Sequence, residues 1–511
     1  GLIALRGFES LPLRQIAFIQ IGFLDKKMID LDAAKNELKE RGLIAWDLET
    51  TGLKTFANSP GGPIKIEFIR PISGAFLLET ELGFETLLDY KARLAPHILP
   101  SPGALVVNGI DPSDLFNPDL PTQLDFAKAV SDLLKDYIPI LCSFNGIGYD
   151  AVILRHFFFE NLCYPYLLSD ANRVHIDLMK IAEAIYAIDP HALNFPRKPN
   201  GNVWLSQEML AKANGIDTGK AHTAVDDTKV VLELGKLFRE IAPDVYFSAI
   251  ASGNKHRVIH HLENEPIVCH AYVERFTRKG KVRALTLIGQ NPVISNNYLT
   301  FDLSYDPEDY LNYSGSDIAE SINKKDSPFF SLKVSDNPIL LPSTYTDKIG
   351  LLGETARRRA ATIDDNFKEK ALQGINTKGN PFADFPVDPY SESKLYAGGF
   401  PEYSDLHETF LNSDYSTRKE LLSQFTDPRI LDFAKRIMAQ DQTTSEPEFY
   451  NEYLEMCRSR FFATSNEVPY LTYDGAMAQI DQIIARDHDE EVVRPILQFY
   501  EDLKNKMEKK A

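Results

Sequence analysis

The first half of the chain alternates short apolar runs with stretches of helical period. Four runs have the length and residue content of strands, and five stretches repeat apolar residues every three or four positions. This alternation is typical of an α/β domain. The predicted strands are 43–53, 63–72, 74–82 and 138–146, and the predicted helices are 124–137, 150–159, 177–187, 205–214 and a long one from about 223.

The pattern changes after residue 250. Short β-like runs punctuated by Gly, Asn and Pro predict a small barrel or sandwich up to about residue 345. Residues 346–375 have helical period, 376–402 are rich in Gly, Pro and Asp, and everything from Ser404 onward is again helical in period. Because 511 residues exceed what one hydrophobic core usually supports, we expect roughly two to four domains.

Charge and cysteine content narrow the functional classes. The formal net charge of −18 opposes non-specific binding to nucleic acid but leaves room for a local basic groove. The cysteines are far apart and form no C-x-x-C pair, which argues against a zinc site or a disulfide scaffold and favours a reducing, cytoplasmic compartment. No apolar stretch reaches the ~18 residues of a membrane helix, so no membrane partner is expected.

Residues 1–41 precede the first predicted strand and are interpreted as an N-terminal extension of unknown role. Arg6 and Arg14 lie in a stretch with few acids, so a targeting peptide stays open as an alternative.

Two acids interrupt the first predicted strand. Asp47 and Glu49 stand two positions apart in the run IAWDLETTGL, so they share one face of the strand while Leu48 packs on the other. Carboxylates that close repel each other unless a cation lies between them. Hard oxygen ligands suit Mg²⁺ or Mn²⁺. The alternative is an ordinary surface strand end, because a D-x-E pattern alone has little specificity.

Further acids follow at two helix starts. Asp150 begins an apolar helix after a glycine turn, where an acid also complements the helix dipole, and an ordinary helix cap is the alternative interpretation. His222 precedes Asp227 by five residues, about 140 degrees around a helix, so we expect His222 on the loop that enters the helix. Asp226 is the rival of Asp227, since it would be an ordinary i+4 neighbour of His222.

This order of motifs resembles the DEDDh class of 3′→5′ exonucleases, with Asp47, Glu49, Asp150, His222 and Asp227 on the five motif positions. The resemblance implies hydrolysis with two Mg²⁺ ions, for which Mn²⁺ can substitute. Asp47 would contact both ions, Glu49 and Asp227 would complete the site that activates water, and Asp150 would hold the second ion. His222 would be the general base, because imidazole can accept a proton near neutral pH.

The stretches 99–115, 164–188, 206–216 and 252–272 further resemble the exodeoxyribonuclease I family, as does GGFPEYSD at 398–405. The first motif, WDLETTG, is closer to proofreading exonucleases, and Ala151 stands where a second acid is familiar. The resemblance implies a monomeric exonuclease in DNA repair or recombination that is specific for single-stranded DNA and releases 5′-mononucleotides. It also implies docking to the C-terminal tail of a single-stranded DNA-binding protein. The implied parts are an RNase H-like exonuclease domain with a mixed sheet (42–245), an SH3-like β domain with a helical extension (250–375), a linker (376–402) and a helical domain (403–511).

Substrate contacts are expected from two stretches. Thr50, Thr51 and Gly52 directly follow the strand acids and are expected at the terminal nucleotide. In YVERFTRKGKVR, cations interleave with aromatic rings, as single-strand binding requires, although a solvated charge run has the same pattern. These cations are Arg275, Arg278, Lys279, Lys281 and Arg283. Two alternatives stay open: a related exonuclease acting on RNA or as a polymerase proofreader, and a catalytically silent nucleic-acid-binding scaffold.

Overall fold

The computed structural model describes most of the chain in three consecutive parts that pack together. None of the described helices is long and apolar enough to cross a membrane. The described residues are 29–219, 223–379, 388–397, 404–441, 446–486 and 490–509.

The first part is built on a five-stranded mixed sheet in the order β3-β2-β1-β4-β5. β1 pairs antiparallel with β2 and parallel with β4, so it lies at the centre of the sheet. The predicted α/β fold with a mixed sheet is confirmed. The strands are β1 (Leu43–Thr50), β2 (Pro71–Thr80), β3 (Gly83–Lys91), β4 (Ile140–Ser143) and β5 (Val174–Asp177).

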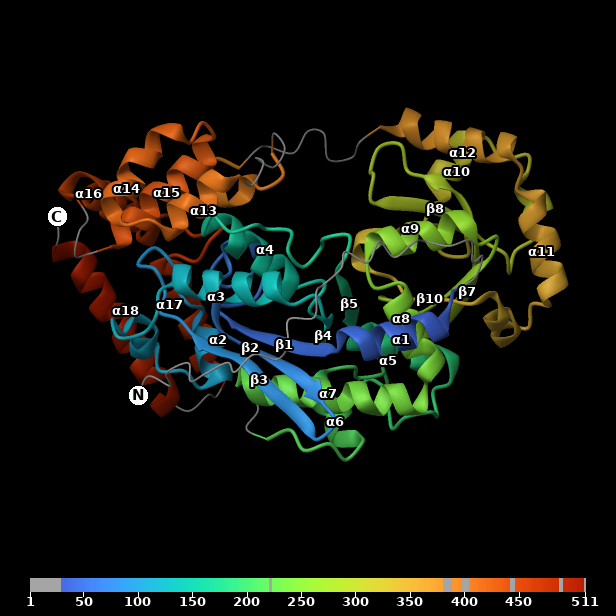
Figure 1. Cartoon of the computed structure of the whole chain (residues 1–511), viewed down its shortest axis with the longest axis horizontal. Coiled ribbons are helices and arrows are strands. Elements are labelled where there is room, and N and C mark those ends of the chain that lie inside the picture. The colour runs from blue at the N-terminus through green and yellow to red at the C-terminus, as the bar shows by residue number, and fades with distance from the viewer. Residues whose placement is uncertain are drawn as a thin grey trace.

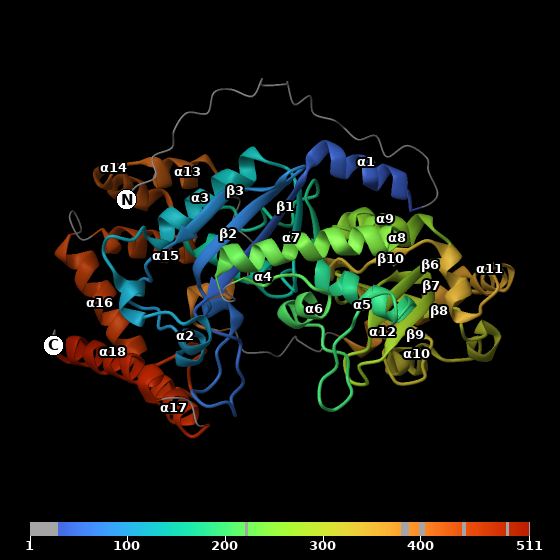
Figure 2. The ribbon, with the colours of Figure 1, turned by 90° about the horizontal axis from the view of Figure 1, so that it is seen from below.

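Helices cover both faces of this sheet, and the side chains of β1 alternate between them. Ile44, Trp46 and Leu48 pack with α3 (Gln123–Asp136) and α4 (Asp150–Glu160). Leu43 and Ala45 face the opposite layer, which contains α5, α7 and α8. Figure 2 shows α7 lying along this second face. The helices of this layer are α5 (Leu178–Ile188), α6 (Gln207–Ala213), α7 (Ala224–Ile241), α8 (Pro243–Ala251) and α9 (Lys255–Asn264).

The helix α1 (Leu31–Arg41) belongs structurally to the first part. It packs against α8, and Glu37 forms ion pairs with both Arg41 and Arg257 of α9. Arg41 also donates hydrogen bonds to the carbonyl groups of Ile138 and Asn172. The last residues of the predicted N-terminal extension therefore support the sheet, while residues 1–28 lie outside the described ranges.

The second part is a five-stranded antiparallel sheet in the order β10-β6-β7-β8-β9, which confirms the β-rich texture expected after residue 250. The more specific prediction of an SH3-like barrel stays a prediction. Its strands are β6 (Val268–Val273), β7 (Gly280–Gln290), β8 (Asn297–Asp302), β9 (Phe329–Lys333) and β10 (Leu340–Leu341), and its helices are α10 (Gly315–Ser321), α11 (Gly353–Thr362) and α12 (Asp365–Lys378).

The third part is helical, as predicted, and lies on the opposite side of the first sheet from the second part (Figure 1). α13 and α15 share a core with α3 and α4, whereas α17 and α18 pack against the short helix α2 (Pro102–Asn108). The helices are α13 (Asp405–Asn412), α14 (Tyr415–Leu421), α15 (Pro428–Gln440), α16 (Pro447–Phe461), α17 (Tyr473–Ile484) and α18 (Glu490–Lys509).

One predicted strand is wrong, and another strand was missed. Residues 63–72 do not form a strand of their own: Ile66–Phe68 is a 3₁₀ turn, and β2 begins only at Pro71. The apolar residues of this segment instead pack on the helical part, as Phe68 does against Tyr470. β3 was not predicted, and the predicted linker contains the ordered segment 388–397, whose Glu392 is buried.

Candidate active site

Asp47 and Glu49 lie on β1, on the face that carries Leu43 and Ala45 and looks toward α7. The backbone around them is fixed on both sides, because β1 pairs with β2 along its whole length and with β4 at its start. Both side chains are half-buried. The central strand therefore holds two carboxylates side by side against the helical layer.

Asp227 reaches this pair from the first turn of α7. Carboxylate oxygens of Asp47, Glu49 and Asp227 all lie within 4.8 Å of one another. The neighbouring Asp226 instead forms an ion pair with Lys229 at 2.8 Å. Of the two acids between which the sequence could not choose, Asp227 is the one that joins the strand acids.

Asp150 is the fourth acid. It is the first residue of α4, follows the turn at Gly146–Tyr149, and is only 7% exposed. Among the neighbouring carboxylates that raise the pKa of Asp47, Asp150 has the largest effect, ahead of Glu49 and Asp227. The structure thus brings together four of the five predicted catalytic residues, from β1, α4 and α7.

The fifth, His222, lies outside the described residues. The described chain resumes at Thr223, whose hydroxyl caps α7 by accepting a hydrogen bond from the Asp226 amide. The helix α7 itself begins at Ala224, and the role of His222 as general base stays a prediction.

Three of the four acids have raised pKa values. Burial, followed by the neighbouring acids, raises the pKa of Asp47 well above its ordinary value. Burial and Asp227 raise the pKa of Glu49 to about 7. Burial, with Asp177 and Glu49, raises the pKa of Asp150 to about 8. Each of these shifts means that the protein pays a free-energy cost to keep these side chains ionised together.

This donor set fits a hard divalent ion. The clustered side chains offer carboxylate oxygens, and the charged groups that act on the pKa of Asp47 are all acids. Mg²⁺ and Mn²⁺ prefer such oxygen ligands and keep several waters, so a few carboxylates suffice. Asp47, Glu49 and Asp227 would hold one ion, and Asp150, whose charge acts on Asp47, would be a ligand of a second.

Thr50 ends β1, and the chain turns away at Thr51 and Gly52, beside the acids. The Thr51 hydroxyl accepts a hydrogen bond from the Arg70 amide at 3.0 Å, and the Tyr149 hydroxyl donates to the Gly52 carbonyl at 2.5 Å. A Cβ at Gly52 would come within 2.9 Å of the Ser101 Cβ, so a larger residue would displace the turn. Thr50 and Thr51 are buried, and their contact with a terminal nucleotide stays a prediction.

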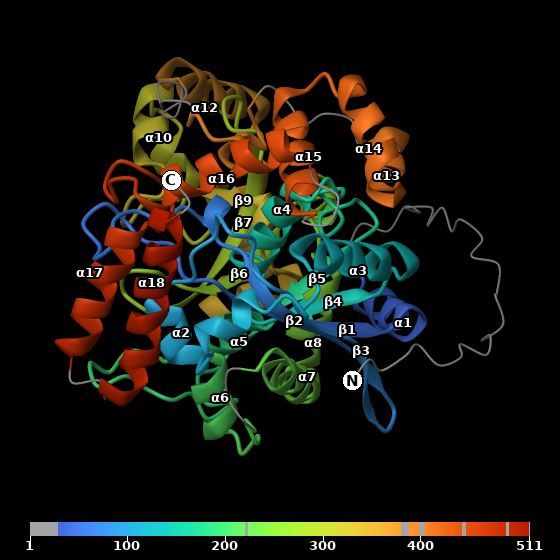
Figure 3. The same ribbon diagram turned by 90° about the vertical axis from the view of Figure 1, so that its left-hand side faces the viewer.

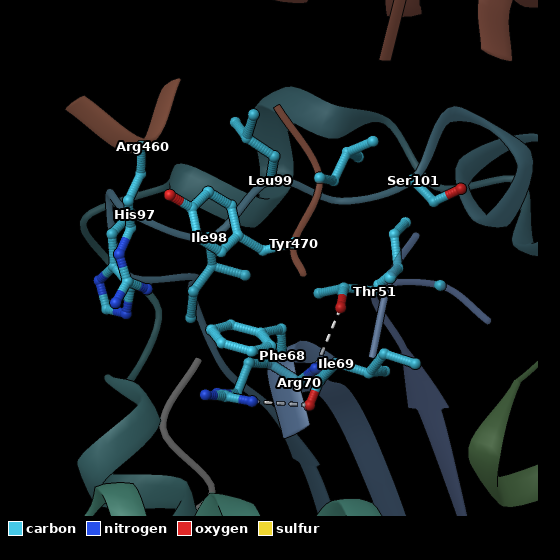
Figure 4. A pocket seen from close by; sticks show the side chains of 13 residues that line it. Thr51, Phe68, Ile69, Arg70, His97, Ile98, Leu99, Ser101, Arg460 and Tyr470 are labelled. Carbon is cyan, nitrogen blue, oxygen red and sulfur yellow. Dashed lines mark hydrogen bonds between the residues drawn. The ribbon is translucent and has the colours of Figure 1, made fainter. Parts of the chain in front are cut away.

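A small pocket lies between this turn and the helical part. Figure 4 shows Thr51, Arg70, His97 and Arg460 among its lining residues, which include none of the four acids. Because none of the four acids lines this pocket, the acid cluster remains the candidate active site.

Buried ion pairs lie on both sides of the boundary between the first part and the helical part. Glu392, whose side chain is 1% exposed, pairs with Arg436 at 2.6 Å and with Arg460 at 2.8 Å. Across the interface, Glu160 at the end of α4 pairs with Arg70 and, at 3.1 Å, with His97. Glu392 and its two arginines thus tie the segment 388–397 to α15 and α16, next to the turn that follows the strand acids.

The five predicted DNA-contacting cations divide into two groups. Lys281 pairs with Glu274 at 2.7 Å, and Arg283 pairs with Asp302 at 2.6 Å. Arg275 and Lys279 are exposed on the turn between β6 and β7, and Arg278, half-buried on the same turn, has a φ of 54°. The turn residues are the more accessible to a phosphate backbone, and all five assignments stay predictions.

Two polar residues that the sequence analysis missed touch the acid cluster. The Asn108 side-chain amide donates a hydrogen bond to Glu49 Oε2 at 2.8 Å. The Gln207 side-chain amide donates to the Asp227 carbonyl at 3.0 Å. In the sequence, Asn108 before Gly109 is indistinguishable from an ordinary helix end, and Gln207 from a surface residue of a short helix.

No protein-family model matches the chain. Among curated proteins, exodeoxyribonuclease I of Haemophilus influenzae is 25% identical over 359 residues, which are 65% of this chain and 74% of that protein. Exodeoxyribonuclease I of Escherichia coli is 27% identical over 171 residues, which are 33% of this chain and 36% of that protein. The sequence relationship thus covers much of the chain at modest identity.

Solved structures extend the match to most of the chain. E. coli exonuclease I in complex with a dA16 oligonucleotide aligns with a TM-score of 0.72 and 19% identity, over 90% of this chain and 99% of that one. SSB/exonuclease I in complex with the inhibitor CFAM aligns over the same shares with a TM-score of 0.70 and 19% identity. The chain therefore shares the fold of these proteins.

Proposed function

We propose that this chain, a relative of exodeoxyribonuclease I in sequence and in fold, is a 3′→5′ exonuclease that degrades single-stranded DNA to 5′-mononucleotides. The observation that carries the proposal is the convergence of Asp47, Glu49, Asp150 and Asp227 from three elements of the first sheet and its helices. Paired divalent ions are the common solution for phosphodiester hydrolysis, and such a cluster is what they require.

Each acid has a proposed task. Asp47, Glu49 and Asp227 would hold one divalent ion, and Asp150 together with Asp47 would hold a second. When bound, Mg²⁺ supplies positive charge that polarises water and offsets the charge of the phosphate. His222 accepts a proton from the attacking water. The water oxygen bonds to the terminal phosphorus, the bond from phosphorus to the 3′ oxygen breaks, and that oxygen leaves with the electron pair and is protonated.

The proposed partners follow from the relatives and from the charge pattern. The exposed cations of the turn between β6 and β7, Arg275 and Lys279, contact the DNA backbone. One related structure is of SSB/exonuclease I, and we extend docking to the tail of a single-stranded DNA-binding protein to this chain. A monomeric state, a place in DNA repair or recombination, and a cytoplasmic location complete the proposal.

A single assay tests the substrate and the cofactor together. A 5′-labelled oligonucleotide is supplied as single-stranded DNA, duplex DNA and RNA, each with Mg²⁺, with Mn²⁺ and with chelator. We expect a ladder of shortened products from single-stranded DNA with Mg²⁺, and none with chelator. Preferred shortening of the RNA would instead select the ribonuclease alternative.

Absence of cleavage under every condition, with retained binding to single-stranded DNA, would select the silent scaffold. The intact carboxylate set argues against that alternative, because a protein that only binds DNA gains nothing from clustering four acids, three of which have pKa values raised by burial and by neighbouring acids.

A further inference from the structure

We propose that Asn108 is a positioning residue for Glu49, and that the C-terminal helices α17 and α18 hold it in place. This inference rests on the proposed function, since it assigns Glu49 to a divalent ion. Asn108 ends α2, a helix that belongs to none of the predicted motifs. Its side chain nevertheless contacts one of the four clustered acids.

The contact has a defined direction. A carboxylate can only accept hydrogen bonds, so the Asn108 amide must present its nitrogen, which donates to Glu49 Oε2 at 2.8 Å. This bond fixes the rotation of the carboxylate and leaves Oε1 for an ion. The preceding residue, Val107, is 58% exposed, and Gly109 ends the helix in the left-handed conformation. Asn108 is therefore the last residue of α2 and the one that faces the acid.

A neutral donor is the appropriate group at this position. Carboxylate oxygens of Asp47 and Asp227 lie within 4.8 Å of those of Glu49, so the ionised form of Glu49 needs support. A lysine or arginine would provide that support, but its charge would compete with a divalent ion for the same carboxylate. An amide stabilises the ionised carboxylate by a hydrogen bond without adding charge to the site.

The C-terminal helices fix α2 from its other side. Figure 3 shows α2 beside α17 and α18, and Leu105 of α2 is buried in one cluster with Ile480 and Ile496. The Tyr500 hydroxyl donates a hydrogen bond to the Pro100 carbonyl, just before the helix.

Ser101, just before α2, connects α17 to the end of β1. Its hydroxyl donates to the Gln479 side chain at 2.7 Å, and its amide donates to the Thr51 carbonyl at 2.6 Å. α2 is thus held between the end of β1 and the last two helices, and Asn108 has little freedom to leave Glu49.

The test measures binding of Mg²⁺ alone by isothermal titration calorimetry, on the full chain without DNA. Removing a partner that orients a metal ligand typically costs ~10–100-fold in affinity. We expect Asn108→Leu, which keeps the size but removes the donor, to raise the dissociation constant for Mg²⁺ by this factor.

Val107→Thr is the matched control, since its exposed side chain lies one position earlier on the same helix. It should bind Mg²⁺ as the unmodified protein does. Asn108→Ser, which is smaller, serves if the leucine variant fails to fold. Binding of Mg²⁺ by a folded Asn108→Leu or Asn108→Ser variant at the unmodified affinity would overturn the inference. The calorimetry contains no DNA, so its result does not depend on cleavage. An unmodified protein that binds Mg²⁺ but cleaves nothing would contradict the proposed function, and the comparison of Mg²⁺ affinities would still test the role of Asn108.

Discussion

Asp150→Asn is predicted to stabilise the metal-free protein. Asp150 is 7% exposed, and burial with the neighbouring Asp177 and Glu49 raises its pKa from 3.8 to about 8. The folded protein therefore holds a proton that the unfolded chain releases between these two values. Since the folded state binds more protons in this window, the free energy of unfolding falls as pH rises through it.

The magnitude follows from the same shift. At pH 7 the unfolded Asp150 is ionised while the folded one is largely protonated, which costs on the order of 4 kcal/mol. Asparagine does not titrate and avoids this cost. It forfeits the favourable interaction of an acid with the start of α4, but that interaction amounts to only ~0.3–1 kcal/mol. The net effect should therefore be stabilising by a few kcal/mol at pH 7.

Urea denaturation in the presence of chelator, at pH 5 and pH 8, measures the effect. The advantage of Asp150→Asn should be larger at pH 8 and smaller at pH 5. Adding Mg²⁺ at a hundred times its dissociation constant should return ~2.7 kcal/mol to the unmodified protein and less to the variant.

Asp125→Asn is the control for a general effect of removing an acid near a helix start. Asp125 accepts hydrogen bonds from the Thr122 amide and hydroxyl in a capping box at α3, so its loss should destabilise by ~1 kcal/mol. An Asp150→Asn variant that unfolds at the same or lower urea concentration than the unmodified protein at pH 8 would refute the reasoning.

Three further predictions test the site, the interface and the DNA contact. Asp227→Ala should abolish cleavage, whereas Asp226→Ala, which removes the ion-pair partner of Lys229, should keep most of the rate. Equal cleavage rates of the two variants in the labelled-oligonucleotide assay would contradict the assignment of Asp227 to the site. Glu392→Gln should lower the free energy of unfolding by ~3 kcal/mol, because buried Arg460 loses its acidic partner and Arg436 keeps only Asp432. Glu408→Gln, at an exposed ion pair, should cost less than ~1 kcal/mol. Urea denaturation of both measures this difference, and comparable losses would show that the buried pair has no special weight. Arg275→Ala should weaken binding to single-stranded DNA and reduce the slope of log affinity against log salt concentration by about one. Fluorescence-anisotropy titrations at several salt concentrations measure this slope, and an unchanged slope would place the DNA elsewhere.

The strand acids could be predicted because the two-residue period of a strand places Asp47 and Glu49 on one face without any tertiary information. Asp150 was predictable as the start of an apolar helix after glycine. The choice between Asp226 and Asp227 was not, because it depends on the ion pair of Asp226 with Lys229 and on how α7 lies on the sheet.

Other features depend on partners far away in the sequence. The segment 63–72 is as apolar as a strand, but its Phe68 packs against Tyr470 of the helical part. Glu392 lies in a stretch with linker composition and is buried only because Arg436 and Arg460 reach it. β3 was missed because it is an edge strand whose residues are mostly exposed, so it lacks the apolar alternation of a half-buried strand.

The hydrogen bond from Tyr500 to Pro100 joins residues 400 positions apart. A ribosome that has translated the whole first sheet has not yet supplied the helices that cover α2. The nascent chain can form its central strand early, but the surroundings of Glu49 are completed only after α17 and α18 have emerged. Excising residues 42–245 as an independent nuclease would therefore leave the apolar side of α2, including Leu105, facing water.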